Sequence, residues 1–357
     1  MGKRIRGLFR FIAWSFLLFI AVLSLGIFLA PWLPLSILPW VQVLSPLLPS
    51  LSVIYALTLL AFLLRKEWIR ALVPAFFLLF SYLIFQQNVR PPSVPQSGDS
   101  PYKVLTYNLG AFEFNKRKVA KVLDLVNEIE PDLIAFQEFR NVEFEDEGRA
   151  IHYFSEALNL PHYQFIHLPS HVHGVAVFSR YPIVKLDTLF LPTEEVNSGM
   201  ITTIDGPDGL FGLGTLHMSS YQIGTTLRRK RTFLGRLKNL TKQIKKVLYL
   251  QEEKYDQIFA VLDSYPHPYI LAGDFNAPSH SRMSRRFRAK LADAYLEKGS
   301  GDGWTFPFRR GKNGSWGMRL DYMYHSPKFE VLECKRVAKV ISDHFPLLGT
   351  FRLKGQP

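Results

Sequence analysis

The chain has 357 residues, enough for one large domain or two smaller ones, and its formal net charge is +13. The single cysteine, Cys334, excludes an internal disulfide. No Asp, Glu, Lys or Arg occurs between Phe11 and Leu64, and a second uncharged run extends from Ala71 to Val89. Because soluble helices need a charged face, these runs are typical of segments in lipid and exclude a wholly soluble protein.

Three transmembrane helices are predicted in residues 1–89. The first covers about 8–30; its basic start also fits a signal peptide, but the apolar stretch is too long for that and more apolar sequence follows. The second covers 41–64, and Pro46 and Pro49 are expected to kink its start or make it re-entrant. The third covers 69–85, near the shorter limit for crossing hydrocarbon.

The positions of the basic residues predict the orientation of these helices. The N-terminal tail and the loop at 65–70 are basic, whereas the loop at 31–40 carries no charge. Since basic loops stay cytoplasmic, three crossings put everything after Val89 on the extracytoplasmic side, and we expect a bacterial inner membrane. One crossing fewer would reverse this prediction.

A Pro- and Ser-rich stretch, 90–101, is interpreted as a linker, and a soluble domain is predicted over 102–357. Residues 1–90 hold eight basic residues and one acidic residue, so the soluble part keeps an excess of about six positive charges. Such an excess favours an anionic partner, either nucleic acid or phospholipid headgroups.

The soluble domain begins with a predicted strand, helix and strand at 102–107, 115–129 and 132–136. This order indicates a crossover unit, in which Asn108 and Glu138 follow equivalent strand ends. A second helix is predicted at 148–158. The many short strands that follow indicate packing of sheet on sheet, and they are expected at 163–168, 174–179, 183–189, 200–204 and 210–217.

A long helix is predicted over 227–262. Its apolar residues form one stripe, while Lys and Arg occupy much of the remaining surface. The favoured interpretation is a helix packed on the core with a solvated basic face. The alternative is a surface that lies against anionic headgroups or a polyanionic substrate.

Polar residues follow several apolar runs. Asp274 and Asn276 come directly after the strand-like run 268–272, and side chains two residues apart on an extended backbone share a face. An ordinary turn is the alternative, because Gly, Asp and Asn are common turn residues. Similar positions after apolar runs are occupied by Asn108, Glu138, His217, Asp321, Asp343 and His344.

With these residues in place, the chain from about 102 to 352 resembles the endonuclease/exonuclease/phosphatase superfamily, with its deoxyribonuclease I-like fold. The resemblance implies an α/β (α+β) four-layer sandwich of two packed mixed β-sheets with outer helices, preceded here by the transmembrane helices. It rests on the motifs TYNLG (106–110), DLIAFQE (132–138), GVAVFSRYPI (174–183), TLH (215–217), GDFN (273–276), RLDYMY (319–324) and SDHFPL (342–347).

The resemblance also implies the roles of individual residues. Glu138 would be the principal ligand of Mg²⁺ or Mn²⁺, with Asn108 and Asp343 nearby, since hard oxygen ligands suit these ions. Asp274 would orient and deprotonate the attacking water. The other roles that the resemblance implies are that Asn276 holds that group or the phosphate, His344 contacts the phosphate, Asp321 fixes the tautomer of His344, and His217 assists the leaving group or binds phosphate. Apart from the resemblance, Arg319 and Arg228 are expected to bind substrate.

The expected function is therefore a membrane-anchored, divalent-metal-dependent phosphoesterase that hydrolyses a phosphodiester outside the cytoplasm. A lipid phosphatase or phospholipase-like enzyme acting on phospholipid or polyprenyl phosphate is the alternative, and a non-catalytic binding protein is the third. The expected partners are a phosphate-ester substrate, either nucleic acid or lipid, and the lipid bilayer; no obligate protein partner is evident. Whether the substrate is nucleic acid or lipid stays open at this point.

Overall fold

A computed structural model gives the fold. It describes residues 2–37, 39–91, 102–110, 116–142, 149–167, 173–190, 197–223, 226, 232–308, 316–339 and 341–354, and all structural statements below refer to these residues.

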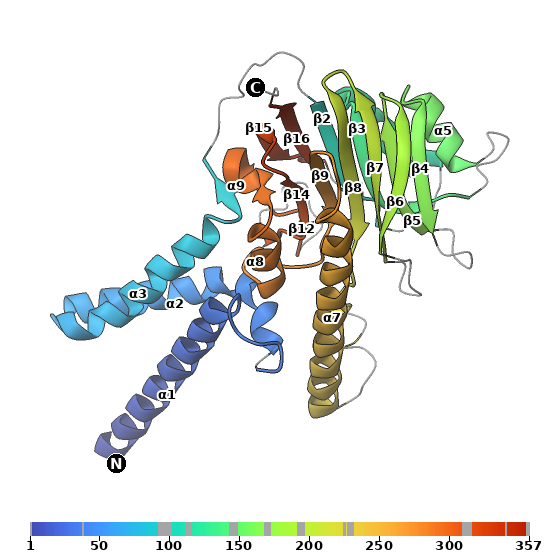
Figure 1. The fold of residues 1–357 in the computed structure, drawn as a ribbon. Coiled ribbons are helices and arrows are strands. Elements are labelled where there is room, and N and C mark those ends of the chain that lie inside the picture. The colour runs from blue at the N-terminus through green and yellow to red at the C-terminus, as the bar shows by residue number, and fades with distance from the viewer. Residues whose placement is uncertain are drawn as a thin grey trace.

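Three apolar helices precede the sheets, at the lower left of Figure 1. They are α1 (Gly2–Leu29), α2 (Leu48–Leu64) and α3 (Trp68–Phe85). Each is long and apolar enough to cross a membrane, over Phe11–Leu29, Ser45–Leu64 and Trp68–Phe85.

The start of the second span is irregular, as its prolines predicted. Two short 3-10 helices, η1 (Pro39–Gln42) and η2 (Ser45–Leu47), come before α2. Pro46 lies in the first turn of η2, and Pro49 lies in the first turn of α2, where the missing amide hydrogen costs nothing. The α-helix proper therefore starts at Leu48, later than the predicted residue 41.

The rest of the chain forms two large mixed sheets, which lie face to face in Figure 1. In spatial order, the eight-stranded sheet contains β1 (Val89–Arg90), β11 (Gly299–Asp302), β15 (Phe329–Arg336), β16 (Leu347–Leu353), β2 (Tyr102–Asn108), β3 (Leu133–Arg140), β5 (His173–Ser179) and β4 (His162–His167). The six-stranded sheet contains β10 (Ala292–Asp293), β14 (Asp321–His325), β9 (Tyr269–Asp274), β8 (Gly209–His217), β7 (Ser198–Gly206) and β6 (Ile183–Phe190). A separate ribbon pairs β12 (Phe306–Pro307) with β13 (Gly317–Met318).

Three apolar clusters define the layers of the sandwich. One cluster joins the inner faces of the two sheets and includes Val104, Leu133, Met200 and Met323. The second lies between the eight-stranded sheet and its helices, and the third lies between the six-stranded sheet and its helices. Helices therefore cover both outer faces, as the sequence predicted, and they are α4 (Lys116–Ile129), α5 (Ala150–Ala157), α7 (Phe233–Leu262) and α8 (Arg282–Arg288).

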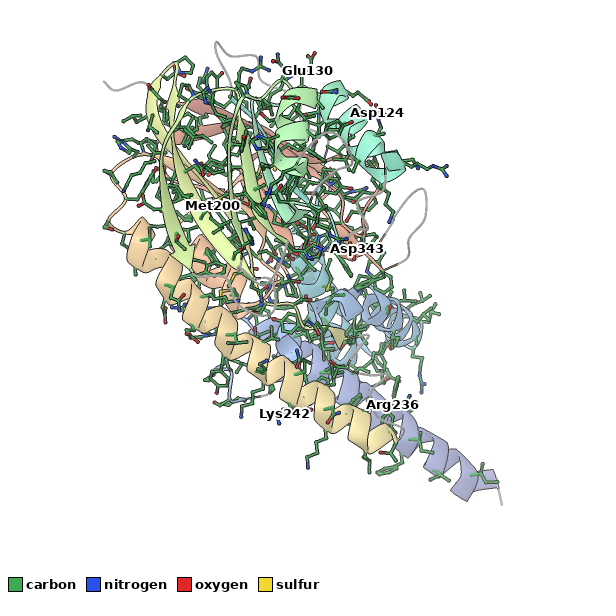
Figure 2. All side chains as sticks on the ribbon, turned by 90° about the vertical axis from the view of Figure 1, so that its right-hand side faces the viewer. Asp124, Glu130, Met200, Arg236, Lys242 and Asp343 are labelled. Atoms are coloured by element: carbon green, nitrogen blue, oxygen red, sulfur yellow. The ribbon has the colours of Figure 1, made fainter. Side chains whose placement is uncertain are left out.

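The strand registers bring the polar strand ends together. The crossover prediction is confirmed, because β2 and β3 are parallel and Asn108 lies opposite Gln137. In the other sheet, Asp274 lies opposite His217 on one side and opposite Asp321 on the other. Each sheet therefore ends in polar residues at the same edge of the sandwich. Figure 2 shows Asp343 at this edge, next to the apolar helices.

Helix α7 packs against two parts of the molecule. Toward its C-terminus, Ile258, Phe259 and Leu262 pack on the six-stranded sheet. Toward its N-terminus, Leu240 and Ile244 belong to a cluster that includes residues of the α1–α2 connection. The basic residues of this half stay exposed, and Arg236 and Lys242 point outward in Figure 2. The apolar stripe packs from Leu240 onward, as the favoured interpretation predicted, whereas Phe233 and Leu237 at the start of the helix are exposed.

The eight-stranded sheet begins almost immediately after α3. Only three residues separate Phe85 from Val89, and β1 pairs antiparallel with β11. The carbonyl of Asn88 accepts hydrogen bonds from the Gly303 amide at 2.7 Å and the Tyr295 hydroxyl at 3.0 Å. The sheet therefore starts inside the stretch that the sequence divided between membrane region and linker. Residues 92–101 of the expected linker lie outside the described residues.

Candidate active site

Asp274 is the centre of the polar cluster at the edge of the sandwich. It ends β9 and is 1% exposed. Its Oδ1 accepts from the Asn276 backbone amide at 2.8 Å, and its Oδ2 accepts from the Asn108 Nδ2 at 2.9 Å. Gly273 allows this placement: its φ is +144°, and a Cβ there would lie 2.2 Å from the Leu216 carbonyl oxygen.

Asn276 is held by two strand ends. Its Nδ2 donates to Asp274 Oδ2 at 3.1 Å and to the Met218 carbonyl at 2.9 Å. Its φ of +48° is a left-handed conformation, which Asn adopts more readily than most residues. The turn after β9 therefore locks the carboxylate of Asp274 in one orientation.

A β-bulge directs Glu138 into the same cluster. The pairing of β3 with β5 shifts register between Phe136 and Phe139, and Glu138 has a φ of +52°. Bulges and left-handed residues are common next to functional sites, where they turn a side chain toward its target. Glu138 Oε1 accepts from Asn108 Nδ2 at 3.3 Å.

His217 lies between the two carboxylates. Its Nε2 is 3.5 Å from Glu138 Oε1 and 3.7 Å from Asp274 Oδ2. It ends β8 and is 6% exposed. The structure therefore gives His217 an acidic neighbour from each sheet, which the sequence alone did not identify.

His344 and Asp321 form the opposite wall. His344 Nδ1 is 2.8 Å from Asp321 Oδ2, and His344 Nε2 is 3.7 Å from Asp274 Oδ2. Burial lowers the pKa of His344, but the carboxylates of Asp321 and Asp274 outweigh it and raise that pKa to about 10. Burial, followed by the charge of Asp321, raises the pKa of Asp274 to about 6.

Asp343 lies beside the strand end that carries Asn108. The Ser342 hydroxyl donates to the Asn108 carbonyl at 2.9 Å and is 3.1 Å from Asp343 Oδ1. Gly110 makes room for this carboxylate: its φ is +68°, and a Cβ there would lie 2.3 Å from Asp343 Oδ1. The GDFN, SDH and TYNLG motifs thus meet at one place, although they are far apart in the sequence.

Comparison with known families decides the classification. Residues 105–344 match the family described as "Endonuclease/Exonuclease/phosphatase family". The chain belongs to this family. Its members hydrolyse phosphoesters, so the cluster around Asp274 is a candidate site for that chemistry.

Solved structures show the same fold. A family protein from Leptotrichia buccalis C-1013-b is 20% identical, with a TM-score of 0.50, over 71% of this chain and 100% of that chain. A humanized D. rerio TDP2 is 13% identical, with a TM-score of 0.51, over 71% and 99% of the two chains. Comparison with curated protein sequences gave no match.

Enzymes of this family generally use a divalent metal, and the donor atoms here fit one. Glu138 and Asp343 offer hard carboxylate oxygens, which Mg²⁺ and Mn²⁺ prefer. A second group, Asp274, Asp321 and His344, has one potential ligand atom from each residue within 4.8 Å of the others. In addition, Asp321 Oδ1 is buried and has no hydrogen-bond partner among the described residues.

Asn108, predicted as a metal ligand, has its amide in a donating orientation. Its Nδ2 points toward Glu138 and Asp274, while its Oδ1 accepts from the Gly110 amide at 2.8 Å. In this orientation the side chain is a hydrogen-bond donor to the two carboxylates. Ligation through its oxygen would require the amide to rotate.

Arg319, predicted to bind substrate, is not available to bind a substrate phosphate. Its side chain is 1% exposed, and it forms a bidentate ion pair with Asp293 at 2.9 and 2.7 Å. Both of these donors are committed to a buried carboxylate, so the guanidinium ties the segment before β14 to β10 instead of reaching a phosphate. Arg228, the other expected substrate ligand, lies outside the described residues.

Several residues that support the candidate active site were not identified from the sequence. The Thr305 hydroxyl accepts from the Leu320 and Asp321 amides, each at 3.1 Å, and so positions the strand that carries Asp321. The Phe306 ring lies 5.1 Å from the ring of His344. Ser342 was visible within the SDH motif, but nothing in the sequence near Thr305 and Phe306 indicates that they contact residues about 15 and 38 positions away.

Proposed function

We propose that this protein is a membrane-anchored, divalent-metal-dependent phosphoesterase whose catalytic base is Asp274. The observation that carries the proposal is the cluster around this buried carboxylate. His217 and His344 each lie 3.7 Å from Asp274, and these two imidazoles in turn contact Glu138 and Asp321. Family membership supports phosphoester hydrolysis as the reaction. The three apolar helices support anchoring, and the basic loops support an extracytoplasmic catalytic domain in a bacterial inner membrane.

Each residue of the site has a separate role in hydrolysis. Asp274, whose pKa of about 6 suits a base near neutral pH, accepts a proton from the attacking water. The water oxygen forms a bond to phosphorus as the bond to the leaving oxygen breaks, and that oxygen takes up a proton. His217 is placed to assist this last transfer. Asn276 keeps Asp274 aligned throughout.

His344 serves as the cation that faces the phosphate. Its raised pKa keeps the imidazole protonated near neutral pH, and Asp321 fixes its orientation through Nδ1. A protonated imidazole already lies between Asp274 and Asp321, so we assign the metal to Glu138 and Asp343, with Asn108 beside them. When bound, the metal supplies positive charge that stabilises the phosphoryl oxygens.

The test uses the full-length protein in detergent with bis(p-nitrophenyl) phosphate and a single-stranded oligonucleotide. Hydrolysis is expected with Mg²⁺ or Mn²⁺ and should be lost in EDTA. Asp274→Asn should reduce turnover by roughly 10²–10⁴-fold, the usual contribution of a general base. Asp263→Asn is the matched control, because Asp263 forms a surface ion pair with Lys290. Equal turnover in the two variants would refute the assignment of Asp274.

A further inference from the structure

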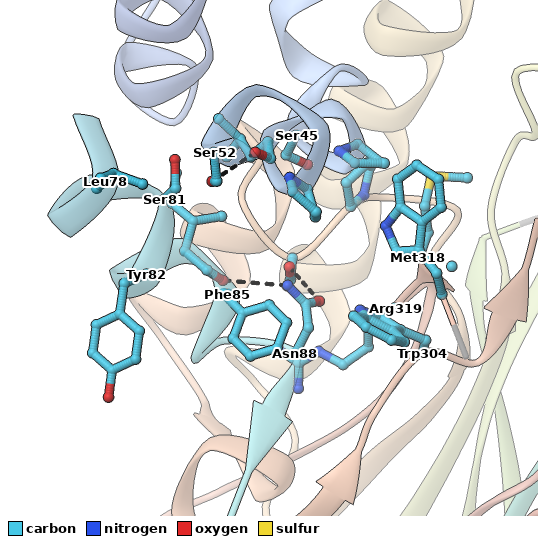
Figure 3. A pocket seen from close by; sticks show the side chains of 18 residues that line it. Ser45, Ser52, Leu78, Ser81, Tyr82, Phe85, Asn88, Trp304, Met318 and Arg319 are labelled. Carbon is cyan, nitrogen blue, oxygen red and sulfur yellow. Dashed lines mark hydrogen bonds between the residues drawn. The ribbon is translucent and has the colours of Figure 1, made fainter. Parts of the chain in front are cut away.

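A cavity of about 310 Å³ lies between the apolar helices and the catalytic domain, as Figure 3 shows. Leu78, Ser81 and Phe85 of α3 line one side, and Pro49 and Ser52 of α2 line another. The remaining wall comes from the catalytic domain. That wall comprises Pro278, Ser279, Trp304, Trp316, Gly317, Met318 and Arg319.

The catalytic-domain wall comes from the same short segments that supply the candidate active site. Pro278 and Ser279 follow Asn276 by two and three residues, and Met318 precedes Asp321 by three. Trp304 precedes Phe306 by two residues. Phe306 pairs with Met318 across the β12–β13 ribbon and packs on His344. Three separate segments therefore contribute residues to the cavity wall and, a few positions along the chain, residues to the candidate active site.

The residues that line the cavity are mostly apolar, so the cavity favours a hydrocarbon chain over a charged group. Arg319 is the one charged residue among the described lining residues, and Asp293 neutralises it. The hydroxyls of Ser52 and Ser81 donate to their own helices, to the Leu48 and Phe77 carbonyls at 2.8 and 2.9 Å. The cavity thus offers apolar contact with few free polar groups, and its volume is at the lower end of ligand pockets, roughly 300–1,000 Å³.

Aromatic residues surround the cavity at the level where the helices end. Tyr82 is 55% exposed, Phe85 is 40% exposed, and Trp316 is 38% exposed and packs on Phe308 at 5.1 Å. Exposed aromatic side chains at the end of a membrane span are typical of the boundary between hydrocarbon and headgroups. The β12–β13 ribbon therefore lies where a headgroup phosphate would be found.

The catalytic domain is fixed against these helices by specific hydrogen bonds. Buried His280 is 3.1 Å from the Phe28 carbonyl and 3.3 Å from Gln87 Nε2. The Arg282 amide donates to Gln42 Oε1 at 2.9 Å, and Ser279 donates to Asn88 Oδ1 at 2.8 Å. Both partners of the junction contribute defined donors and acceptors, so the cavity is a built feature of the fold.

Together, these observations point to a substrate, and we infer that it is a lipid phosphoester. One hydrocarbon chain lies in the cavity between α2, α3 and the β12–β13 ribbon, while the phosphate lies at the Asp274 cluster. This inference rests on the proposed function and specifies its substrate class. Because the cavity is small, it holds the headgroup-proximal part of a single chain, and the remainder of the lipid stays in the bilayer.

The test compares two tryptophan variants on adjacent residues of α3. Leu78 lines the cavity, whereas Leu79 is 60% exposed on the outer surface of the helix. In detergent micelles containing dioleoyl phosphatidic acid or dioleoyl phosphatidylglycerol, Leu78→Trp should reduce kcat/KM by roughly tenfold or more, the scale of losing a few methylene contacts. Leu79→Trp should match the unmodified protein. Leu79→Trp should also hydrolyse bis(p-nitrophenyl) phosphate, which has no long chain, at the unmodified rate, and the ratio of lipid to bis(p-nitrophenyl) phosphate turnover should fall in Leu78→Trp alone.

A binding measurement keeps the test independent of turnover and of folding defects. The Asp274→Asn protein is irradiated with a phosphatidic acid that carries a diazirine near the headgroup end of one chain, the part that the cavity would hold. Labelling of the α3 and β13 segments is expected, competed by unlabelled dioleoyl phosphatidic acid and reduced by added Leu78→Trp but not by Leu79→Trp.

The outcomes separate the two proposals. If the unmodified protein hydrolyses the oligonucleotide and bis(p-nitrophenyl) phosphate but neither lipid, the lipid inference is overturned and the phosphoesterase proposal stands. The lipid inference is likewise overturned if Leu78→Trp and Leu79→Trp act alike on the lipids and are labelled alike. If no phosphoester of any class is hydrolysed with Mg²⁺ or Mn²⁺, the proposed function itself is overturned.

Discussion

The candidate active site and the cavity beside it are built from the same segments but by opposite chemistry. The active site buries two carboxylates and two imidazoles, and Asp274, Asn276 and His344 each have a hydrogen-bond partner from a distant segment. In the cavity, the hydroxyls of Ser52 and Ser81 bond only within their own helices, and apolar contact dominates. Substitutions in the first region should therefore change the chemistry, whereas those in the second should change which substrate fits.

The largest effect within this comparison is expected for Asp321→Asn. An amide cannot supply the negative charge that raises the pKa of His344 from its ordinary value to about 10, so that pKa should fall. Because the proposed role of His344 requires the protonated form, the alkaline limb of the pH–rate profile should move to lower pH. Turnover should also fall by roughly 10²-fold or more. An unchanged alkaline limb would contradict this role of the Asp321–His344 pair.

Arg319→Met should mainly affect stability. The substitution leaves Asp293 buried without its cation, and removing one partner of a buried ion pair costs about 3–5 kcal/mol. Denaturation of the intact protein in detergent measures the loss. Arg352→Met is the control, since its ion pair with Glu330 is solvent-exposed and should matter much less. Comparable losses in both variants would show that Arg319 is not a structural anchor.

Gly110→Ala should have an intermediate effect on the active site. The left-handed backbone costs a non-glycine residue about 1–3 kcal/mol, and the new methyl group would displace the carboxylate of Asp343. We therefore expect weaker activation by the metal, visible as a higher Mg²⁺ or Mn²⁺ concentration at half-maximal rate. Gly301→Ala, at a φ of +71° with open space around it, separates backbone strain from displacement of the carboxylate.

The smallest effect is expected for Ser81→Ala in the cavity. The Ser81 hydroxyl donates only to the Phe77 carbonyl of its own helix, so its removal strands no buried partner. Stability should change by less than about 1 kcal/mol, and hydrolysis of lipid and of soluble substrates should stay unchanged. A substantial loss on lipid alone would mean that the hydroxyl contacts the substrate directly.

Much of the fold was predictable because hydrophobic periodicity and strand-end residues are local signals. The packing of sheet on sheet, the crossover from β2 to β3 and the three apolar helices all follow from such patterns, whereas the four-layer arrangement was implied by the family resemblance. The pairing of β1 with β11 was not predictable in this way, because two residues carry no periodicity. The late start of α2 reflects Pro46 and Pro49, whose influence was expected but whose boundary was not.

In the candidate site, too, the residues marked by local motifs were predictable and the contacts between distant segments were not. Motifs identified Asp274, Asn276, His344 and Asp321, and the structure brings these four residues together. Arg319 was misassigned because an arginine next to a catalytic motif has the same local sequence whether it faces a phosphate or Asp293, 26 residues away. The orientation of the Asn108 amide and the cavity beside α3 depend on contacts between distant segments, which no single motif encodes.

The three-residue connection between α3 and β1 has a kinetic consequence. With the proposed anchoring, a catalytic domain attached so closely, and hydrogen-bonded to the ends of its own helices, would sample a thin layer of space above the lipid surface. For a substrate that diffuses in the same leaflet, the relevant concentration is then the number of molecules per unit area. Diluting the substrate with inert lipid should slow such an enzyme, whereas diluting the whole suspension with buffer should not.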